Sequence, residues 1–312
     1  MKIVAIEPIN MSAAQVRRYE QLFNQIGHQF VCFPDRSEDP IILKQRLKHA
    51  DVAIVSNIRL NSDILSSSSR LKLLSVAFTG LDHIDLGFCY DQGIEIMNTS
   101  GYATTAVAEL TVGLIIDLYR RITFFNNEIR NGGSRKNFLG KQMRGKTAGI
   151  IGTGLIGKET ALSLKALGCK VIAWDKIEDP DLRSSGIPYY PLDELLSISD
   201  IISLHLPLNE QTENLISAEK LELCQPNAIL INTARGKIVN TSALAHALRN
   251  GIIAGAAIDV FDAEPPLPQN HPLLTVPNCI LLPHVGYATC EAFDTRIEMA
   301  VNNVIRWLKG QE

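Results

Sequence analysis

Three residues in the C-terminal part of this 312-residue chain carry side chains suited to anion binding and proton transfer: Arg235, Glu264 and His284. A guanidinium can hold a planar carboxylate through two parallel hydrogen bonds and can polarise a neighbouring carbonyl. An imidazole can donate a proton near neutral pH, and a carboxylate bonded to its other nitrogen favours the protonated form. The three side chains together could bind a 2-oxo acid and protonate its carbonyl oxygen while a hydride adds to the carbon.

Each of these residues also has an ordinary structural explanation. An arginine in a loop is more often solvated or ion-paired, and a glutamate before Pro265 and Pro266 often belongs to a turn. A histidine after Pro283 can simply bond to the backbone. A redox function therefore needs a second signal, namely a site for a hydride carrier in the same part of the chain.

That signal is the segment 152–157, Gly-Thr-Gly-Leu-Ile-Gly, which follows the apolar run 147–151 and opens a helical pattern. The Gly-x-Gly-x-x-Gly pattern between a strand and a helix is typical of dinucleotide-binding turns. Gly152 permits the tight turn, Gly154 lets the backbone approach a pyrophosphate, and Gly157 lets the helix pack closely on its strand. The sequence therefore predicts a nucleotide site.

A second apolar run, residues 170–174, ends at Asp175. An acid about 20 residues beyond the glycines is where the ribose hydroxyls are held. The carboxylate of Asp175 would accept bonds from both hydroxyls and repel a 2'-phosphate, so NAD is favoured over NADP. The neighbouring Lys176 weakens this preference.

Short apolar runs alternate with helix-like segments along the whole chain, which is typical of βαβ units and parallel sheets. We expect strands near 2–6, 29–33, 52–56, 73–77, 94–97, 147–151, 170–174, 201–204, 228–232, 254–258 and 279–282. We expect helices over 13–26, 41–50, 104–122, 155–167 and 291–309. The roughly 145 residues before the glycine motif are enough for a separate domain. The expected fold is α/β, with two Rossmann-like lobes built on doubly wound parallel sheets, and the C-terminal helix returning to the first lobe.

Composition excludes several other classes of protein. A net charge of -3 and a pI near 6.2 give no electrostatic reason for binding nucleic acid or a membrane surface. No apolar stretch is long enough to span a membrane, and the first residues do not resemble a signal peptide, so a cytoplasmic location is expected. The six cysteines form no Cys-x-x-Cys pair and no short Cys/His ligand spacing, which predicts reduced, mostly buried thiols and no metal site.

With these motifs in order, the chain resembles the D-isomer-specific 2-hydroxyacid dehydrogenases over essentially its whole length. Besides the glycine motif, the resemblance rests on the stretches 78–86 (FTGLDHIDL), 108–111 (AELT), 205–208 (HLPL), 232–236 (NTARG), 257–261 (AIDVF), 264–266 (EPP) and 283–286 (PHVG). It implies a flavodoxin-like substrate-binding domain of residues 1–98 plus 285–312, and an NAD-binding Rossmann domain of residues 99–284. It also implies an active site in the cleft between these lobes and a homodimer formed through the nucleotide lobe.

The resemblance also implies roles for individual residues. Arg235, Glu264 and His284 take the catalytic positions, with His284 as the acid in the reductive direction and Glu264 as its partner. The backbone amides of Thr79 and Gly80 would receive the substrate carboxylate together with Arg235. The implied cofactor contacts are Gly152, Gly154, Leu155, Ile156, Gly157, Asp175, Leu206, Pro207, Thr212, Thr233, Ala234, Asp259 and Gly286.

Departures from related patterns narrow the substrate. Phosphoglycerate dehydrogenases carry arginines at the positions of Ser56 and Val76, phosphite dehydrogenases place a lysine within 76–81, and formate dehydrogenases have glutamine at the position of Glu264. The remaining class is a small D-2-hydroxy acid with an uncharged tail, such as glycerate, glycolate or lactate, with hydroxypyruvate, glyoxylate or pyruvate as the oxo acid. Phe78 would either line this pocket or pack in the core.

Two alternatives stay open at this point. Some relatives act mainly as NAD-sensing interaction proteins that keep the fold while their surfaces recruit partners. The same chemistry could also act on a branched 2-oxo acid, or on a phosphorylated acid such as 3-phosphoglycerate bound through a lysine or arginine that the sequence does not reveal.

Overall fold

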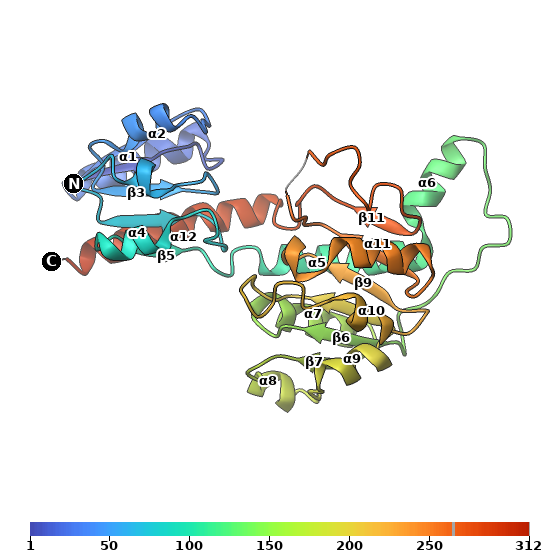
Figure 1. Cartoon of the computed structure of the whole chain (residues 1–312). Helices are drawn as coiled ribbons and strands as arrows, with labels where there is room; N and C mark the ends of the chain where they lie inside the picture. Colours follow the sequence, from blue (N-terminus) through green and yellow to red (C-terminus); the bar gives the residue numbers. More distant parts are fainter. Residues whose placement is uncertain (264–265, 312) are drawn as a thin grey trace. The chain divides into compact units, whose positions relative to one another are not determined.

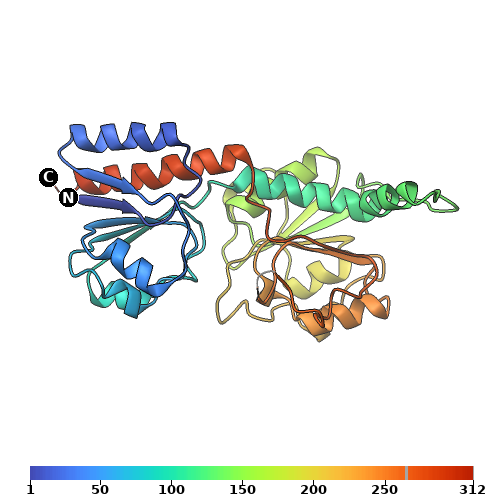
Figure 2. The ribbon, with the colours of Figure 1, turned by 90° about the horizontal axis from the view of Figure 1, so that it is seen from above.

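The computed structural model describes residues 1–263 and 266–311 (Figures 1 and 2). The chain divides into a first unit, Met1–Ala103 with Thr289–Glu312, and a second unit, Thr104–Ala288. Both boundaries lie a few residues beyond the expected positions at 98 and 284. The first unit extends past residue 98 because the Tyr102 ring packs near Phe78 and Arg296 of that unit.

The first unit is built on a five-stranded parallel sheet with the strand order β2-β1-β3-β4-β5. This is the flavodoxin-like order. Its strand β1 aligns Val4 with Val31 on one side and with Ala53 on the other. The strands are β1 (Lys2–Ala5), β2 (Gln29–Cys32), β3 (Val52–Val55), β4 (Leu73–Val76) and β5 (Glu95–Asn98).

Helices cover both faces of this sheet. They are α1 (Ala13–Gln25), α2 (Pro40–Leu47), α3 (Ser62–Leu65), α4 (Leu86–Asp91) and α12 (Cys290–Lys309). The helices α1 and α12 lie side by side on one face (Figure 2), where Phe23 and Val304 share a buried apolar cluster with Ile54 of the sheet. The helices α2, α3 and α4 pack on the other face of the sheet, where they form a second buried apolar cluster with it. The predicted return of the C-terminal helix to the first lobe is confirmed, because α12 contacts β3, β4 and β5.

The second unit is built on a six-stranded parallel sheet with the order β11-β10-β9-β8-β6-β7. Its strands are β6 (Thr147–Ile151), β7 (Lys170–Trp174), β8 (Ile201–Leu204), β9 (Ile229–Asn232), β10 (Gly255–Ile258) and β11 (Cys279–Leu281). The strand order reverses between β6 and β8. Ligands of open parallel sheets bind at such a switch point, beyond the carboxyl ends of the strands.

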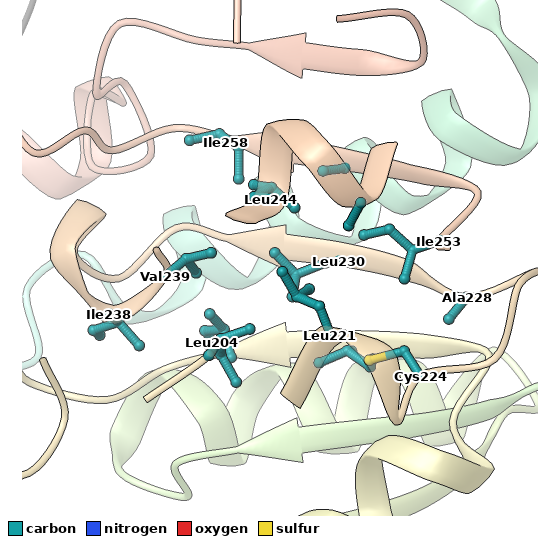
Figure 3. Close-up of a cluster of buried hydrophobic side chains, with 14 of the residues drawn as sticks. Leu204, Leu221, Cys224, Ala228, Leu230, Ile238, Val239, Leu244, Ile253 and Ile258 are labelled. Atoms are coloured by element: carbon teal, nitrogen blue, oxygen red, sulfur yellow. The ribbon is translucent and has the colours of Figure 1, made fainter. Parts of the chain in front are cut away.

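The helices of the second unit also form two layers. They are α5 (Thr104–Arg120), α6 (Ile122–Arg130), α7 (Leu155–Ala166), α8 (Pro180–Ser184), α9 (Leu192–Ile198), α10 (Ala218–Glu222), the 3-10 helix η1 (Gly236–Ile238) and α11 (Thr241–Arg249). The helices α5 and α7 pack against each other on one face of the sheet. On the other face, Leu221 of α10 and Leu244 of α11 pack with Leu230 of β9 (Figure 3). The predicted two-lobed parallel α/β fold is confirmed.

Two expected helices end earlier than their apolar patterns suggested. The helix expected over 104–122 stops at Arg120, because Arg121 adopts a left-handed backbone with φ +52° and begins a new helix, α6. The amide of Thr123 then donates to the Asp117 carboxylate at 2.9 Å. The helix expected over 41–50 begins at Pro40 and ends at Leu47, where the Ala50 amide bonds to the Leu47 carbonyl and turns the chain into β3.

None of the helices within the described residues is long and apolar enough to cross a membrane. The six cysteines are free thiols, of which Cys89, Cys169 and Cys224 are buried and Cys290 is exposed. Burial raises the pKa of Cys89 to about 11 and that of Cys224 to about 12.

Candidate active site

The glycine turn after β6 is shaped by contacts that exclude side chains. Gly152 has a left-handed backbone with φ +95°, and its amide donates to the Trp174 carbonyl at 2.8 Å. A Cβ atom on Gly152 would lie 2.6 Å from the His205 carbonyl oxygen, and one on Gly157 would lie 1.9 Å from the Gly152 carbonyl oxygen. Glycine at these two positions is therefore required by the turn itself.

Gly154 differs from its two neighbours in the motif. A Cβ atom added there would meet no described atom within 4 Å. Gly154 precedes α7 as its N-cap, no described side chain caps this helix end, and Leu155 is exposed. The free amides of a helix N-terminus attract anions. The open space and these amides fit a pyrophosphate that approaches the backbone at Gly154, with Ile156 in the first turn.

Asp175, at the carboxyl end of β7, is held against the glycine turn. One carboxylate oxygen accepts hydrogen bonds from the amide and the hydroxyl of Thr153, at 2.6 and 3.1 Å. The other accepts from the Lys176 amide at 2.7 Å. The hydroxyl of Tyr189 donates to the Thr153 hydroxyl at 3.0 Å. Asp175 is therefore fixed beside the turn, where a ribose would follow the pyrophosphate.

The segment after β8 packs directly beneath the turn. His205 is hydrogen-bonded through Nε2 to the Ser203 hydroxyl at 2.9 Å, and desolvation of its ring lowers its pKa to about 3. The predicted contacts Leu206, Pro207 and Thr212 follow, and the Thr212 hydroxyl donates to the Pro207 carbonyl at 2.7 Å. The motif 205–208 predicted no separate role for His205, whose backbone carbonyl lies against Gly152 of the turn.

The loop after β9 is organised by the buried side chain of Asn232. Its amide group donates to the Arg235 carbonyl at 2.9 Å, and its oxygen accepts from the Ala234 amide at 3.0 Å. The Thr233 hydroxyl pairs with the Thr111 hydroxyl of α5 at 3.2 Å. One guanidinium nitrogen of Arg235 donates to the Ala234 carbonyl at 2.7 Å. Arg235 is thereby presented at the carboxyl end of its strand.

Asp259 and His284 follow the neighbouring strands β10 and β11. Asp259 is 1% exposed, and its two carboxylate oxygens accept from the amides of Val285 and Gly286, each at 2.8 Å. His284 has a left-handed backbone with φ +56°. Its ring packs edge-on against the Tyr287 ring, with the two ring centroids 5.5 Å apart. The carboxyl ends of the six strands thus carry all the predicted residues of the second unit except Glu264, which lies outside the described residues.

The predicted substrate-binding residues Thr79 and Gly80 lie in the first unit, after the carboxyl end of β4. The Thr79 carbonyl accepts from the Asn98 side chain at 2.8 Å. The adjacent Phe78 is partly buried against an apolar cluster of this unit and contacts the ring of His83 edge-on. Phe78 therefore packs on the core of the first unit, and whether it also lines the substrate pocket stays a prediction.

A buried polar network at the same edge of the first sheet was missed from the sequence. The Glu7 carboxylate, 3% exposed, accepts from the Ser56 amide at 2.7 Å and from Arg36 at 2.8 Å. Arg296 of α12 donates to the Ser56 hydroxyl at 3.2 Å and lies over the Phe293 ring. The available signal was the arginine within the apolar stripe of the C-terminal helix. Among the described residues, His, Cys, Asp and Glu form no cluster that could hold a metal ion.

Comparison with known proteins places this geometry among dehydrogenases. Residues 112–286 match the family model described as D-isomer specific 2-hydroxyacid dehydrogenase, NAD binding domain. The glyoxylate reductase of Thermofilum pendens is 39% identical over 282 residues, which cover 88% of this chain and 83% of that protein.

Two solved structures are similar over nearly the whole chain. The D-lactate dehydrogenase of Aquifex aeolicus, complexed with NAD and lactic acid, superposes with a TM-score of 0.85 at 30% identity, covering 99% of this chain and 96% of that one. An acyclic imino acid reductase, Bsp5, in complex with NADPH and D-Arg, gives a TM-score of 0.88 at 30% identity, covering 99% and 98%.

Proposed function

This chain belongs to the D-isomer-specific 2-hydroxyacid dehydrogenase family, and we propose that its substrate is a small uncharged-tail 2-oxo acid of the glyoxylate or hydroxypyruvate type. The enzyme is an NAD-linked oxidoreductase that acts on the CH–OH group of a 2-hydroxy acid. The proposal for glyoxylate rests on the name of the Thermofilum relative and on the absence of a cationic side chain at positions 76–81.

The residues that would hold NAD are those of the glycine turn and the loops beside it. Gly152 and Gly157 form the turn, Gly154 leaves room for the pyrophosphate, and Asp175 would accept bonds from the ribose hydroxyls. When bound, NADH supplies the hydride that reduces the oxo carbon. Thr233, Ala234 and Asp259 lie at the carboxyl ends of the next strands, at the edge of the sheet where the nicotinamide half would extend.

We assign the remaining chemistry to residues of this chain. Arg235 binds the substrate carboxylate and polarises the carbonyl, and the amides of Thr79 and Gly80 bind the same carboxylate. His284 holds the proton that passes to the carbonyl oxygen during reduction and takes it back during oxidation. Glu264 would favour the protonated imidazole. The observation that carries this proposal is that Arg235 and His284 follow strands at the same sheet edge as the glycine turn.

The test is the initial rate of NADH oxidation with glyoxylate, hydroxypyruvate, pyruvate, 2-oxoisocaproate and phosphohydroxypyruvate. We expect the highest kcat/KM with glyoxylate or hydroxypyruvate. A preference for 2-oxoisocaproate would overturn the assignment to a small substrate. The absence of turnover with every acid, together with measurable NADH binding, would instead favour a nucleotide-sensing role.

We also propose that the enzyme prefers NADH to NADPH. The Asp175 carboxylate is fixed by Thr153, so it cannot easily turn away from a 2'-phosphate, and like charges at short range repel. Nearby Lys158 could neutralise such a phosphate, but its ammonium is held by Asp179 and Asp181 at 3.0 and 2.6 Å. Running the same assays with NADPH measures the preference directly.

A phosphorylated 2-oxo acid is the second candidate substrate, because Arg296 reaches the position where phosphoglycerate dehydrogenases carry an arginine. Its guanidinium lies 3.2 Å from the Ser56 hydroxyl. Arg296 belongs to α12, whereas the arginine of those enzymes stands at the position of Ser56 itself. If this cation binds a phosphate, phosphohydroxypyruvate should exceed hydroxypyruvate in kcat/KM, and Arg296→Met should reverse that order. An unchanged ratio in the variant would exclude the role.

We propose that the protein is a homodimer formed through the second unit. Helix α6 buries none of its residues, and Phe124, Ile129 and Leu139 are all exposed. A hollow of about 910 Å³ lies beside Phe124 and Leu139, and it is lined mainly by α5, residues 138–141 and β11. Exposed apolar patches of this kind mark interfaces, and a two-fold dimer would cover the same patch on both copies.

Sedimentation or light scattering tests this assembly. Leu139→Asp should shift the protein to a monomer, because the side chain is 82% exposed in the isolated chain but would be buried in the dimer. Ile177→Asp is the matched control, since Ile177 is 83% exposed elsewhere in the same unit. A wild-type monomer, or the same shift in both variants, would overturn the proposed interface.

A further inference from the structure

The backbone at His284 adopts a conformation that its side chain does not favour. His284 has φ +56°, in the left-handed region that residues other than glycine seldom occupy. Such conformations persist only where the surrounding structure fixes them, and they concentrate at functional sites. The contacts that hold the backbone of His284 in this conformation therefore determine the orientation of its imidazole.

The next two amides are held by a single carboxylate. Asp259 accepts from the Val285 amide through Oδ1 and from the Gly286 amide through Oδ2, both at 2.8 Å. The Asp259 side chain is almost completely buried, and its own amide is tied to the Asn232 carbonyl at 3.0 Å. A buried carboxylate needs hydrogen bonds to offset its lost hydration, and bonds to an ionised group are strong.

Gly286 allows this close approach. A Cβ atom at that position would lie 2.9 Å from Oδ2 of Asp259. The carboxylate therefore fits against bare backbone immediately after His284. Beyond this segment, the Tyr287 ring packs edge-on against the imidazole at 5.5 Å.

We propose that Asp259 is a positioning residue for the reaction: it clamps the backbone of residues 285–286 and so holds His284 in the orientation from which its imidazole donates a proton. This inference rests on the proposed role of His284. It gives Asp259 a function beyond the expected contact with the cofactor, because its two oxygens hold the backbone of residues 285–286.

A double-mutant cycle tests the proposal, with His284→Ala, Asp259→Asn and the double variant assayed under saturating substrate. The Asp259→Asn change would keep the shape of the side chain but turn an N–H donor toward one of the two backbone amides. We expect this variant to lower kcat by about 100-fold while KM for NADH stays within about threefold. In the His284→Ala background the same change should lower kcat by less than about twofold, because Asp259 acts through His284.

Gly286→Ala provides a second probe of the same clamp, should Asp259→Asn fail to fold. Asp200→Asn is the matched control, because that carboxylate accepts the Thr147 amide at 3.0 Å at the opposite, amino-terminal edge of the sheet. It should lower the Tm without the selective loss of kcat.

Four outcomes would overturn the inference. Additive losses in the cycle would show that Asp259 acts independently of His284. A rise in KM for NADH with normal kcat would make Asp259 a cofactor contact only. A wild-type enzyme without 2-oxo acid reductase activity, or a fully active His284→Ala variant, would remove the proposed function itself and the inference with it.

Discussion

A Cβ atom on Gly157 would lie 1.9 Å from the carbonyl oxygen of Gly152, so the first and third glycines of the motif are in direct backbone contact. The second glycine, Gly154, has no such neighbour among the described residues. The three positions therefore serve different purposes: two allow the turn to close, and one leaves space for a ligand.

This difference predicts opposite results for two alanine variants. Gly157→Ala should destabilise the protein by about 3 kcal/mol, the upper end of the cost of overpacking. Gly154→Ala should leave the Tm nearly unchanged and weaken NADH binding by at least about tenfold, a loss of about 1.4 kcal/mol. Thermal unfolding and fluorescence titration with NADH distinguish the two effects. Normal NADH affinity in Gly154→Ala would contradict the assigned approach of the pyrophosphate.

Replacing Asp175 should relax the choice of cofactor. Asp175→Ser removes the fixed charge and should lower the ratio of kcat/KM for NADH over NADPH by about tenfold or more. Thr153→Val is a useful companion, because it removes one of the two Thr153 bonds to the carboxylate and keeps the charge. A ratio unchanged in Asp175→Ser would show that selectivity resides elsewhere.

Replacing the proposed acid, His284, and replacing the arginine that binds the substrate carboxylate, Arg235, should change different kinetic constants. His284→Ala should reduce kcat by about 100- to 10,000-fold with little change in the Kd for NADH. Arg235→Lys keeps the charge but cannot form the bidentate hydrogen bonds to a carboxylate. Besides a lower kcat, we therefore expect a higher KM for the oxo acid. Steady-state kinetics and NADH titration measure both. Near-normal turnover of His284→Ala would mean that another group supplies the proton.

The lowered pKa of His205 predicts a specific dependence of stability on pH. Its pKa is lowered from 6.5 to about 3 by burial, so the folded state keeps it neutral where the unfolded chain protonates it. Its contribution to stability is complete above pH 6.5 and is lost progressively as the pH falls from 6.5 toward 3. Each pH unit in this window costs up to about 1.4 kcal/mol.

The variant His205→Gln lacks this titration. Its stability deficit relative to wild type should therefore shrink by about 2 kcal/mol between about pH 6.5 and 5. The two Tm curves, measured from about pH 5 to 8, should converge toward the acid end. Parallel curves across that range would show that the ring is not held neutral in the folded protein.

The sheets could be predicted well from the sequence for a physical reason. Strands of a parallel sheet are buried on both faces, so their sequences are continuous apolar runs such as 52–55. Function-bearing residues then follow from position, because ligands bind beyond the carboxyl ends of such strands. Arg235, Asp259 and His284 were predicted in this way.

Other parts of the site depend on contacts that leave no local pattern. The bonds from Val285 and Gly286 to Asp259 join residues separated by 26 and 27 positions in the chain. Arg296 lies within a helix whose apolar stripe predicted only packing, yet its guanidinium bonds to Ser56, 240 positions away. The left-handed backbone of Arg121, which divides α5 from α6, is equally invisible in an apolar periodicity that runs through it.

The order of synthesis along the chain delays completion of the apolar core of the first unit. Its sheet is made from residues before Ala103, but the helix α12, which packs on one face of β3, β4 and β5, is synthesised only after the whole second unit. The second unit is continuous in sequence and can complete its core while translation continues, since domains generally fold as units from the N-terminus. The apolar face that receives Val304 and Trp307 therefore lacks this helix until the second unit has been synthesised, so an apolar surface of the first unit is exposed on the nascent chain during that time.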